Sequence, residues 1–252
     1  MHLSYQGIKQ EKGDFVEVQD ELVMESPFSI SINDEPWTVT MQTPGQEREL
    51  AAGLLFTEGI TKKKEPSELE WQWQREEGSG ECSLNVFIAN REDVVSNRRS
   101  LMSIASCGIC GKTSFELPHG NVLPQQKGEF DFSVLWQAFQ SHQALFARSG
   151  GSHAAAIAND ANEIVTSFED IGRHNAVDKC IGDLWLKGKL SEAKILLVSG
   201  RISYEIIAKC FMAAIPAIAA VSAPSTMAVD FAKEWGIELW GFCREGRQTK
   251  YA

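Results

Sequence analysis

Two cysteines three positions apart are the residues of this chain with the clearest chemical potential. They lie in the stretch Ser106-Cys107-Gly108-Ile109-Cys110-Gly111-Lys112. Such a pair places both sulfur atoms on one side of a tight loop or helix start, which suits metal ligation, dithiol redox chemistry or sulfur transfer. The neighbouring glycines allow backbone movement, and the Lys112 ammonium favours the thiolate form of a cysteine.

The ligand count weighs against zinc. A structural zinc site takes four ligands, usually from two such pairs, and this sequence has one pair. A zinc nucleobase deaminase would show H-x-E and P-C-x-x-C, but no histidine here is followed by x-Glu, and Ser106 precedes Cys107. We therefore expect no structural metal.

Redox chemistry and sulfur transfer are harder to separate. A thioredoxin-like pair should open a helix early in a βαβ unit, whereas this pair lies in mid-chain before an irregular region. In sulfur transfer, a thiolate takes up a sulfur atom as a persulfide and passes it on, and a second thiol assists its release. The residues alone leave both chemistries open.

Composition restricts the partners and the compartment. The net charge of −10 and the pI of about 5.1 weigh against non-specific binding to nucleic acid or to an anionic membrane. The first residues form no secretory signal, and the charge-free stretch 210–229 is interrupted by Pro216 and Pro224. We expect a cytoplasmic protein, in which the apolar helical settings of Cys180 and Cys210 indicate buried, inert thiols.

The first part of the chain is predicted to be β-rich. Alternating residues 28–32 and 37–41 flank a turn and predict a hairpin. Residues 47–58 have helical spacing and end at Gly59. Further predictions are a surface excursion with some strand character over 61–80, a strand over 83–89 and a helix over 91–103.

The later part alternates regularly between helices and strands. The predicted helices are 133–147, capped by Ser133, and 176–186, 204–214 and 226–235. The predicted strands are 153–158, 163–168, 195–198, 217–221 and 237–242. This order predicts a mixed, largely parallel sheet covered by helices on both faces. We divide the chain into a β-rich α+β region (1–105), a thiol loop and linker (106–130) and an α/β domain (131–252).

Four polar turns follow strands of this predicted sheet: residues 169–175, 199–201, 222–225 and 242–247. Ligands of such sheets bind at the carboxyl ends of the strands, where arginine forks and glycines suit phosphate groups. Each turn alone could serve only as a cap, but together they predict a pocket for a large, multiply phosphorylated ligand. His174 and Asp178 share a helix face, either as an acid–base pair, as half a metal site or as a structural pairing, and His153 is a further candidate.

Several segments together resemble the FdhD family, the sulfurtransferases that act as accessory proteins of formate dehydrogenase. The resemblance extends in family order over residues 43–247. Its segments are Thr43-Pro44-Gly45, Glu49 to Gly59, Ser106 to Lys112, His153 to Ala156, Glu169 to Lys179, Val198 to Arg201, Val221 to Ser225 and Gly241 to Arg247.

This resemblance implies a fold and an activity. The fold would be a three-layer α/β/α core like that of cytidine deaminases, in a homodimer. Cys107 would receive sulfur as a persulfide from a cysteine desulfurase, with Cys110 assisting. The sulfur would pass to the bis-molybdopterin guanine dinucleotide molybdenum cofactor, which formate dehydrogenase needs in sulfurated form.

The resemblance also points to cofactor-binding residues. By motif these are Phe242, Cys243, Arg244, Glu245, Gly246 and Arg247. By their place in the other turns they are Arg173, His174, Ser199, Gly200, Arg201 and Ser222. Glu245 departs from the family pattern, which often has an uncharged residue at this position. An acid there opposes phosphate unless it points away or pairs with Arg244 or Arg247.

Two alternatives remain beside the sulfurtransferase. One is a chaperone that binds and delivers the molybdenum cofactor without sulfur transfer. The other is a dithiol oxidoreductase that forms a reversible Cys107–Cys110 disulfide.

Overall fold

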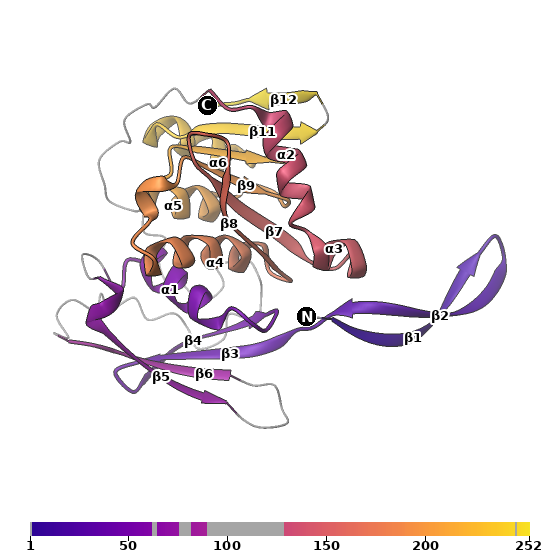
Figure 1. Ribbon diagram of the computed structural model, residues 1–252, viewed down its shortest axis with the longest axis horizontal. Coiled ribbons are helices and arrows are strands. Elements are labelled where there is room, and N and C mark those ends of the chain that lie inside the picture. The colour runs from indigo at the N-terminus through magenta and orange to yellow at the C-terminus, as the bar shows by residue number, and fades with distance from the viewer. Residues whose placement is uncertain (1, 62–64, 76–81, 90–128, 245) are drawn as a thin grey trace.

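A computed structural model describes residues 2–61, 65–75, 82–89, 129–244 and 246–252. These residues form two sheets, the helices that pack on them, and a two-stranded ribbon at the N-terminus (Figure 1). The predicted helix over 91–103 lies outside the described residues. So does the Cys107–Cys110 pair.

The larger sheet has six strands in the order β12-β11-β10-β9-β7-β8. Strands β9, β10 and β11 are parallel, whereas β7 is antiparallel to β8 and β9, and β12 is antiparallel to β11. The strands are β7 (His153–Ala158), β8 (Ile164–Asp170), β9 (Ile195–Val198), β10 (Ala217–Ala220), β11 (Glu238–Arg244) and β12 (Arg247–Lys250). The predicted mixed sheet is confirmed, but it is not largely parallel, because three of its five strand pairings are antiparallel.

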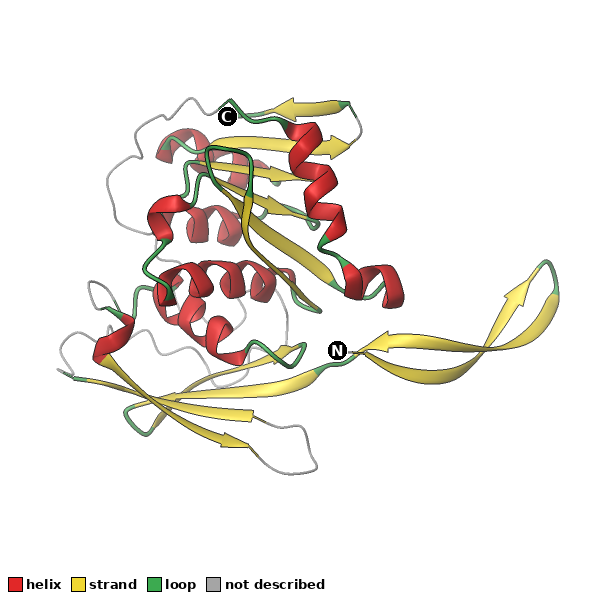
Figure 2. Ribbon diagram, viewed as in Figure 1, coloured by secondary structure: helices red, strands yellow, loops and turns green. Residues whose placement is uncertain are grey.

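Helices cover both faces of this sheet (Figure 2). Ala156 and Leu197 lie in a core with α2 (Phe132–Ser141). Ala155 and Leu196 lie in the opposite core, with α4 (Arg173–Leu186), α5 (Tyr204–Met212) and α6 (Thr226–Trp235). Because both faces are buried, the central strands are apolar throughout rather than alternating.

The N-terminal part forms the second sheet, with strand order β4-β3-β6-β5. Its strands are β3 (Ser26–Ile32), β4 (Glu35–Gln42), β5 (Leu69–Arg75) and β6 (Cys82–Ile88), and the short helix η1 (Pro66–Glu68) precedes β5. Every second residue of β3 is buried, as expected when one face meets a core and the other meets solvent. The core on this sheet includes Leu50 and Leu55 of α1 (Glu47–Thr57), which confirms the predicted hairpin and helix.

Helices α1 and α4 join the two parts of the fold at a close crossing. A Cβ atom at Gly53 would overlap the backbone carbonyl oxygen of Asp178, and one at Gly182 would overlap that of Glu49. Two glycines therefore allow the helix backbones to touch. Helix α4 is buried on nearly all sides, and its Trp185 reaches the core of the N-terminal sheet.

Some predicted boundaries are wrong. The helix expected over 133–147 is two helices, α2 and α3 (Ala144–Ser149), since His142 Nδ1 and Gln143 Nε2 contact the carbonyl oxygens of Ala138 and Phe139 at the break. Asp131, not Ser133, caps α2, and its Oδ1 accepts two backbone N–H bonds.

The first and the last of the four polar turns also differ from expectation. Strand β8 extends to Asp170 and α4 begins at Arg173, so the predicted loop over 169–175 shrinks to Ile171 and Gly172. The stretch expected as a turn over 242–247 continues β11 and returns as β12, so it belongs to a hairpin.

An N-terminal ribbon extends away from the body of the protein (Figure 1). It consists of β1 (His2–Glu11) and β2 (Asp14–Val23), which lie in the region predicted to be β-rich, although this pair of strands was not itself predicted. Its register places Leu3, Leu22, Tyr5 and Val16 on one face, and all four are exposed. No helix among the described residues is both long and apolar enough to cross a membrane.

Candidate functional site

The four polar turns lie along one edge of the six-stranded sheet. Strand β9 ends at Val198, which pairs with Ala220 at the end of β10 and with Ala155 near the start of β7. His153, at the start of β7, pairs with Asp170 at the end of β8. We call this edge, with residues 169–175, 199–201, 222–225 and the described part of 242–247, the carboxyl edge.

Hydrogen bonds connect neighbouring turns along this edge. Ser199 Oγ accepts a bond from the Ala154 N–H at 2.9 Å, which ties the β9 turn to β7. The Ile202 N–H donates to the Ala223 carbonyl at 3.2 Å, and the Phe242 N–H donates to the Ser222 carbonyl at 3.1 Å. Ser199 and Ser222 therefore hold the edge together, whatever else they bind.

One end of the carboxyl edge carries a basic cluster, made of His153, Arg173 and Arg201. A Cβ at Gly200 would lie 3.3 Å from Arg173 Cδ and 3.4 Å from His153 Nδ1, so both side chains converge on this glycine. Burial lowers the pKa of His153, and the positive charges of Arg173 and Arg201 lower it further, against an opposing effect of Asp170. These effects together favour the neutral form of His153.

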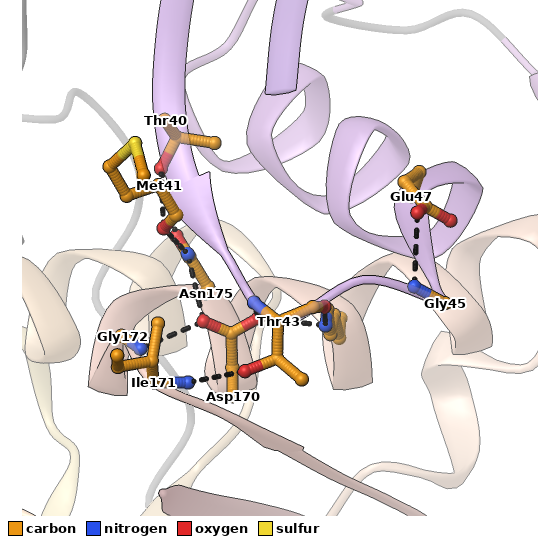
Figure 3. A network of polar contacts seen from close by, with 10 residues as sticks. Thr40, Met41, Thr43, Gly45, Glu47, Asp170, Ile171, Gly172 and Asn175 are labelled. Atoms are coloured by element: carbon orange, nitrogen blue, oxygen red, sulfur yellow. Dashed lines mark hydrogen bonds and ion pairs between the residues drawn. The ribbon is translucent and has the colours of Figure 1, made fainter. Parts of the chain in front are cut away.

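Asp170 organises the start of α4 beside this cluster (Figure 3). One carboxylate oxygen accepts bonds from the Gly172 N–H at 2.8 Å and from Asn175 Nδ2 at 3.0 Å. The other accepts a bond from the Thr43 N–H at 3.1 Å and lies 2.7 Å from Lys179 Nζ. Because Asp170 and Lys179 are both fully buried, this network fixes the backbone from which Arg173 projects.

The arginines of the edge have no acidic partners among the described residues. Within the described ranges, no ion pair involves Arg173, Arg201, Arg244 or Arg247, although the whole chain has a net charge of −10. The Arg173 Nε atom is buried and has no hydrogen-bond partner among the residues that the structure describes. Unpaired guanidinium groups on one edge are suited to binding phosphate or another oxyanion.

The other end of the edge is the β11–β12 hairpin. The pairing of its strands shifts between Gly241 and Arg244, and Phe242 there has a φ of +54° and an exposed side chain. A bulge of this kind redirects a side chain. Arg244 and Arg247 are exposed, but the Cys243 side chain is buried and its pKa is raised by burial to about 11, so a ligand meets the backbone of Cys243 rather than its thiol.

His174 and Asp178 do not form a pair. His174 Nε2 lies 3.4 Å from Ser203 Oγ and 3.9 Å from a Glu205 carboxylate oxygen. Asp178 lies 2.7 Å from Lys209 Nζ and accepts a 2.9 Å bond from the Thr57 hydroxyl. Of the alternatives weighed from the sequence, these contacts favour a structural role for both residues.

The sequence analysis did not single out Asp170 or Lys179 as supports of the site. The sequence did contain one signal for this pair: Lys179 lies in the apolar pattern of a predicted helix. A lysine in such a position is usually buried in an ion pair. Cys107, Cys110 and Glu245 lie outside the described residues. Among the residues that the structure describes, no three His, Cys, Asp or Glu side chains gather as a metal site would require.

Comparisons with known proteins agree on one family. The FdhD/NarQ family matches residues 23–252. A sulfur carrier protein FdhD of Streptomyces coelicolor is 37% identical over 246 residues, covering 92% of this chain and 87% of the relative. The protein of the same name from Picrophilus torridus is 36% identical over 245 residues, covering 93% of this chain and 91% of the relative.

A solved structure shares the fold. It is that of a protein from Desulfotalea psychrophila described as a candidate formate dehydrogenase accessory protein, with a TM-score of 0.73 and 20% identity. The likeness covers 99% of this chain and 96% of that one. On the match to residues 23–252 and on these relatives, the chain belongs to the FdhD/NarQ family.

Proposed function

We propose that this protein is a sulfur carrier that serves formate dehydrogenase. It would receive sulfur from a cysteine desulfurase as a persulfide on Cys107 and pass it to the bis-molybdopterin guanine dinucleotide molybdenum cofactor, bound as substrate. The relatives' name, sulfur carrier protein, supports the first half of the proposal. The observation that carries the second half is the carboxyl edge, whose arginines lack acidic partners in the described part of an acidic protein.

The sulfur steps balance with the two cysteines and a cellular dithiol that reduces them afterwards. The Cys107 thiolate attacks the terminal sulfur of the desulfurase persulfide, and the desulfurase thiolate leaves. Cys110 then attacks Cys107 Sγ, forms a Cys107–Cys110 disulfide and releases the terminal sulfur as sulfide, the form that a metal takes up. The thiol pair supplies the two electrons, and a cellular dithiol reduces it again.

The arginines would bind the phosphates of the two guanine dinucleotides. Arg173 and Arg201 lie at one end of the edge and Arg244 and Arg247 at the other, where no described atom would lie within 4 Å of a Cβ at Gly246. His174 and Ser222 would support this surface through their contacts with Ser203 and Phe242. We extend the proposal to a cytoplasmic location, a cytidine-deaminase-like core, and no nucleic-acid or membrane partner.

Cys107 is expected to carry one added sulfur atom after incubation with a cysteine desulfurase and cysteine. Mass spectrometry of the intact protein and of its peptides measures the adduct. Cys107→Ala should carry no adduct, whereas the matched Cys110→Ala variant should keep it. An adduct that persists in Cys107→Ala contradicts the proposal.

The arginine edge by itself would also suit a chaperone that binds the cofactor without sulfur transfer. The two functions predict different formate dehydrogenase activities when the Cys107→Ala variant is expressed in cells that lack the native protein. A chaperone with Cys107→Ala should still support formate dehydrogenase activity, whereas the sulfur carrier should lose nearly all of it.

We also propose a homodimer in which the N-terminal ribbon contacts a second copy. A two-stranded ribbon is marginally stable alone in water, and one face of this ribbon exposes Leu3, Tyr5, Val16 and Leu22. The same face on a second copy is self-complementary about a two-fold axis.

Replacing Tyr5 and Val16 by lysine is therefore expected to weaken the dimer at least tenfold. Light scattering across a dilution series measures the dissociation. The matched control, Gln6→Lys with Gln19→Lys on the opposite face, should leave it unchanged. Equal dimer stability in both variants contradicts this role of the ribbon.

A further inference from the structure

His153, the first residue of the segment His153 to Ala156, lies beside Arg173 and is influenced by the charge of Arg201, and the proposed sulfur chemistry does not use it. It is half-buried at the start of β7, next to Arg173 of α4 and near Arg201 after β9. Gly200 allows the three elements to close on one another, because a Cβ there would contact both His153 and Arg173. A protonated histidine beside two arginines is electrostatically unfavourable unless an anion completes the group.

The carboxylates near this cluster have other partners. Asp170 accepts bonds from two backbone N–H groups and Asn175, and it pairs with Lys179. The Glu169 carboxylate accepts bonds from the Leu145 and Phe146 N–H groups and from Ser152, and Glu205 lies against His174. The positive charges of Arg173 and Arg201 are therefore not neutralised by the described residues.

The basic cluster is separate from the arginines of the β11–β12 hairpin. In strand order, β10 and β11 lie between β9 and β12. Neighbouring strands are about 4.8 Å apart, so β9 lies about 10 Å from β11, which carries Arg244, and about 14 Å from β12, which carries Arg247. The two arginine pairs therefore start from backbone positions two and three strands apart.

We infer that His153, Arg173 and Arg201 form an oxyanion subsite of their own, which takes a diphosphate group and binds a proton on His153 together with it. Arg173 and Arg201 supply paired N–H donors, and His153 donates a further hydrogen bond to the anion. The inference deepens the proposed function, because it assigns one of the cofactor's two diphosphates to this cluster. It does not involve Cys107.

The pH dependence follows from the charges that face His153. In the free protein, burial, Arg173 and Arg201 hold the His153 pKa below its usual value, and Asp170 acts against them. A bound anion adds negative charge and raises this pKa, so binding takes up a proton between the two values. Affinity is therefore highest below the free-state pKa and falls as pH rises towards the bound-state pKa.

Calorimetry with inorganic pyrophosphate tests the subsite in a full-length background with Arg244→Gln and Arg247→Gln, which removes the other arginine pair. Titration at pH 7 in two buffers of different ionisation enthalpy counts the protons taken up. We expect that Arg201→Gln weakens binding about tenfold or more, in line with the loss of a charge-assisted hydrogen bond. His153→Gln should weaken it less and reduce the proton uptake. Any protons that pyrophosphate itself takes up or releases on binding are the same for the protein with and without His153→Gln. The difference in proton uptake between the two proteins is therefore assigned to His153.

Two results would overturn the subsite. One is equal affinity with and without Arg201→Gln, and the other is equal proton uptake with and without His153→Gln. Circular dichroism confirms that each variant is folded, and Arg173→Lys, which keeps the charge but loses the fork, serves as a milder variant. Because Cys107→Ala should bind pyrophosphate normally, failure here is distinguishable from failure of the persulfide test.

Discussion

A Gly182→Val variant is expected to lose about 3 kcal/mol or more of its stability, because overpacking a tight contact typically costs about 1–3 kcal/mol and this contact involves backbone. A Cβ at position 182 would overlap the Glu49 carbonyl oxygen, and the reciprocal position, Gly53, faces the Asp178 carbonyl in the same way. A backbone atom cannot rotate away as a side chain can. Helices α1 and α4 would have to separate, which opens the core shared by both sheets.

Urea denaturation followed by circular dichroism measures this loss. A total stability of about 5–15 kcal/mol for a typical domain leaves little reserve after such a change. The matched control is Gly7→Val in β1, where the added Cβ would contact only Val18 Cγ2 at 3.7 Å. Equal midpoints for Gly182→Val and the wild type would show that the helix crossing tolerates a side chain.

We expect the second large effect from replacing Asp170 by asparagine. The free energy of unfolding should fall by about 3–5 kcal/mol, the usual cost of breaking a buried ion pair by removing one partner. Lys179 would remain fully buried, 2.7 Å from an amide instead of a carboxylate. The network around Gly172 and Asn175 would also loosen, and with it the start of α4. Oxyanion binding at Arg173 should weaken in any molecules that remain folded.

Two further variants show whether the stability loss comes from the buried charges. In the exposed Lys189–Glu192 ion pair, Lys189 Nζ lies 3.1 Å from Glu192 Oε1. Glu192→Gln removes one partner of this pair and should lower the stability by less than about 1 kcal/mol. The double variant Asp170→Leu, Lys179→Met removes both buried charges and should recover part of the stability lost in Asp170→Asn. If Asp170→Asn and Glu192→Gln unfold at the same urea concentration, the buried network is not what holds α4 in place.

Local signals explain which elements could be predicted. Helix α6 was predicted with its observed bounds, because Ser225 caps its start by accepting the Ala228 N–H bond and Gly236 ends it with a φ of +72°. Strand β9 was also predicted as observed, because a short apolar run between polar turns has few alternatives. Both signals act within a few residues of the chain.

The N-terminal ribbon escaped prediction for the opposite reason. In β1 and β2, lysine, aspartate, glutamate and glutamine occur among the apolar residues, so no buried face repeats along either strand. Pairing between the two strands, from His2 with Val23 to Glu11 with Asp14, is what makes them a ribbon. Composition does not reveal such pairing when neither face is fully buried.

For the site, the sequence by itself determined the residue types: a thiol pair, four arginines in polar turns, and the glycines that let a ligand approach. Only the tertiary structure brought His153 against Arg173, paired Asp170 with Lys179 and buried the Cys243 thiol. The physical reason is distance along the chain. Caps and periodicity act over one or two turns, whereas the Thr43 N–H reaches Asp170 across 127 positions and depends on how α1 packs against α4.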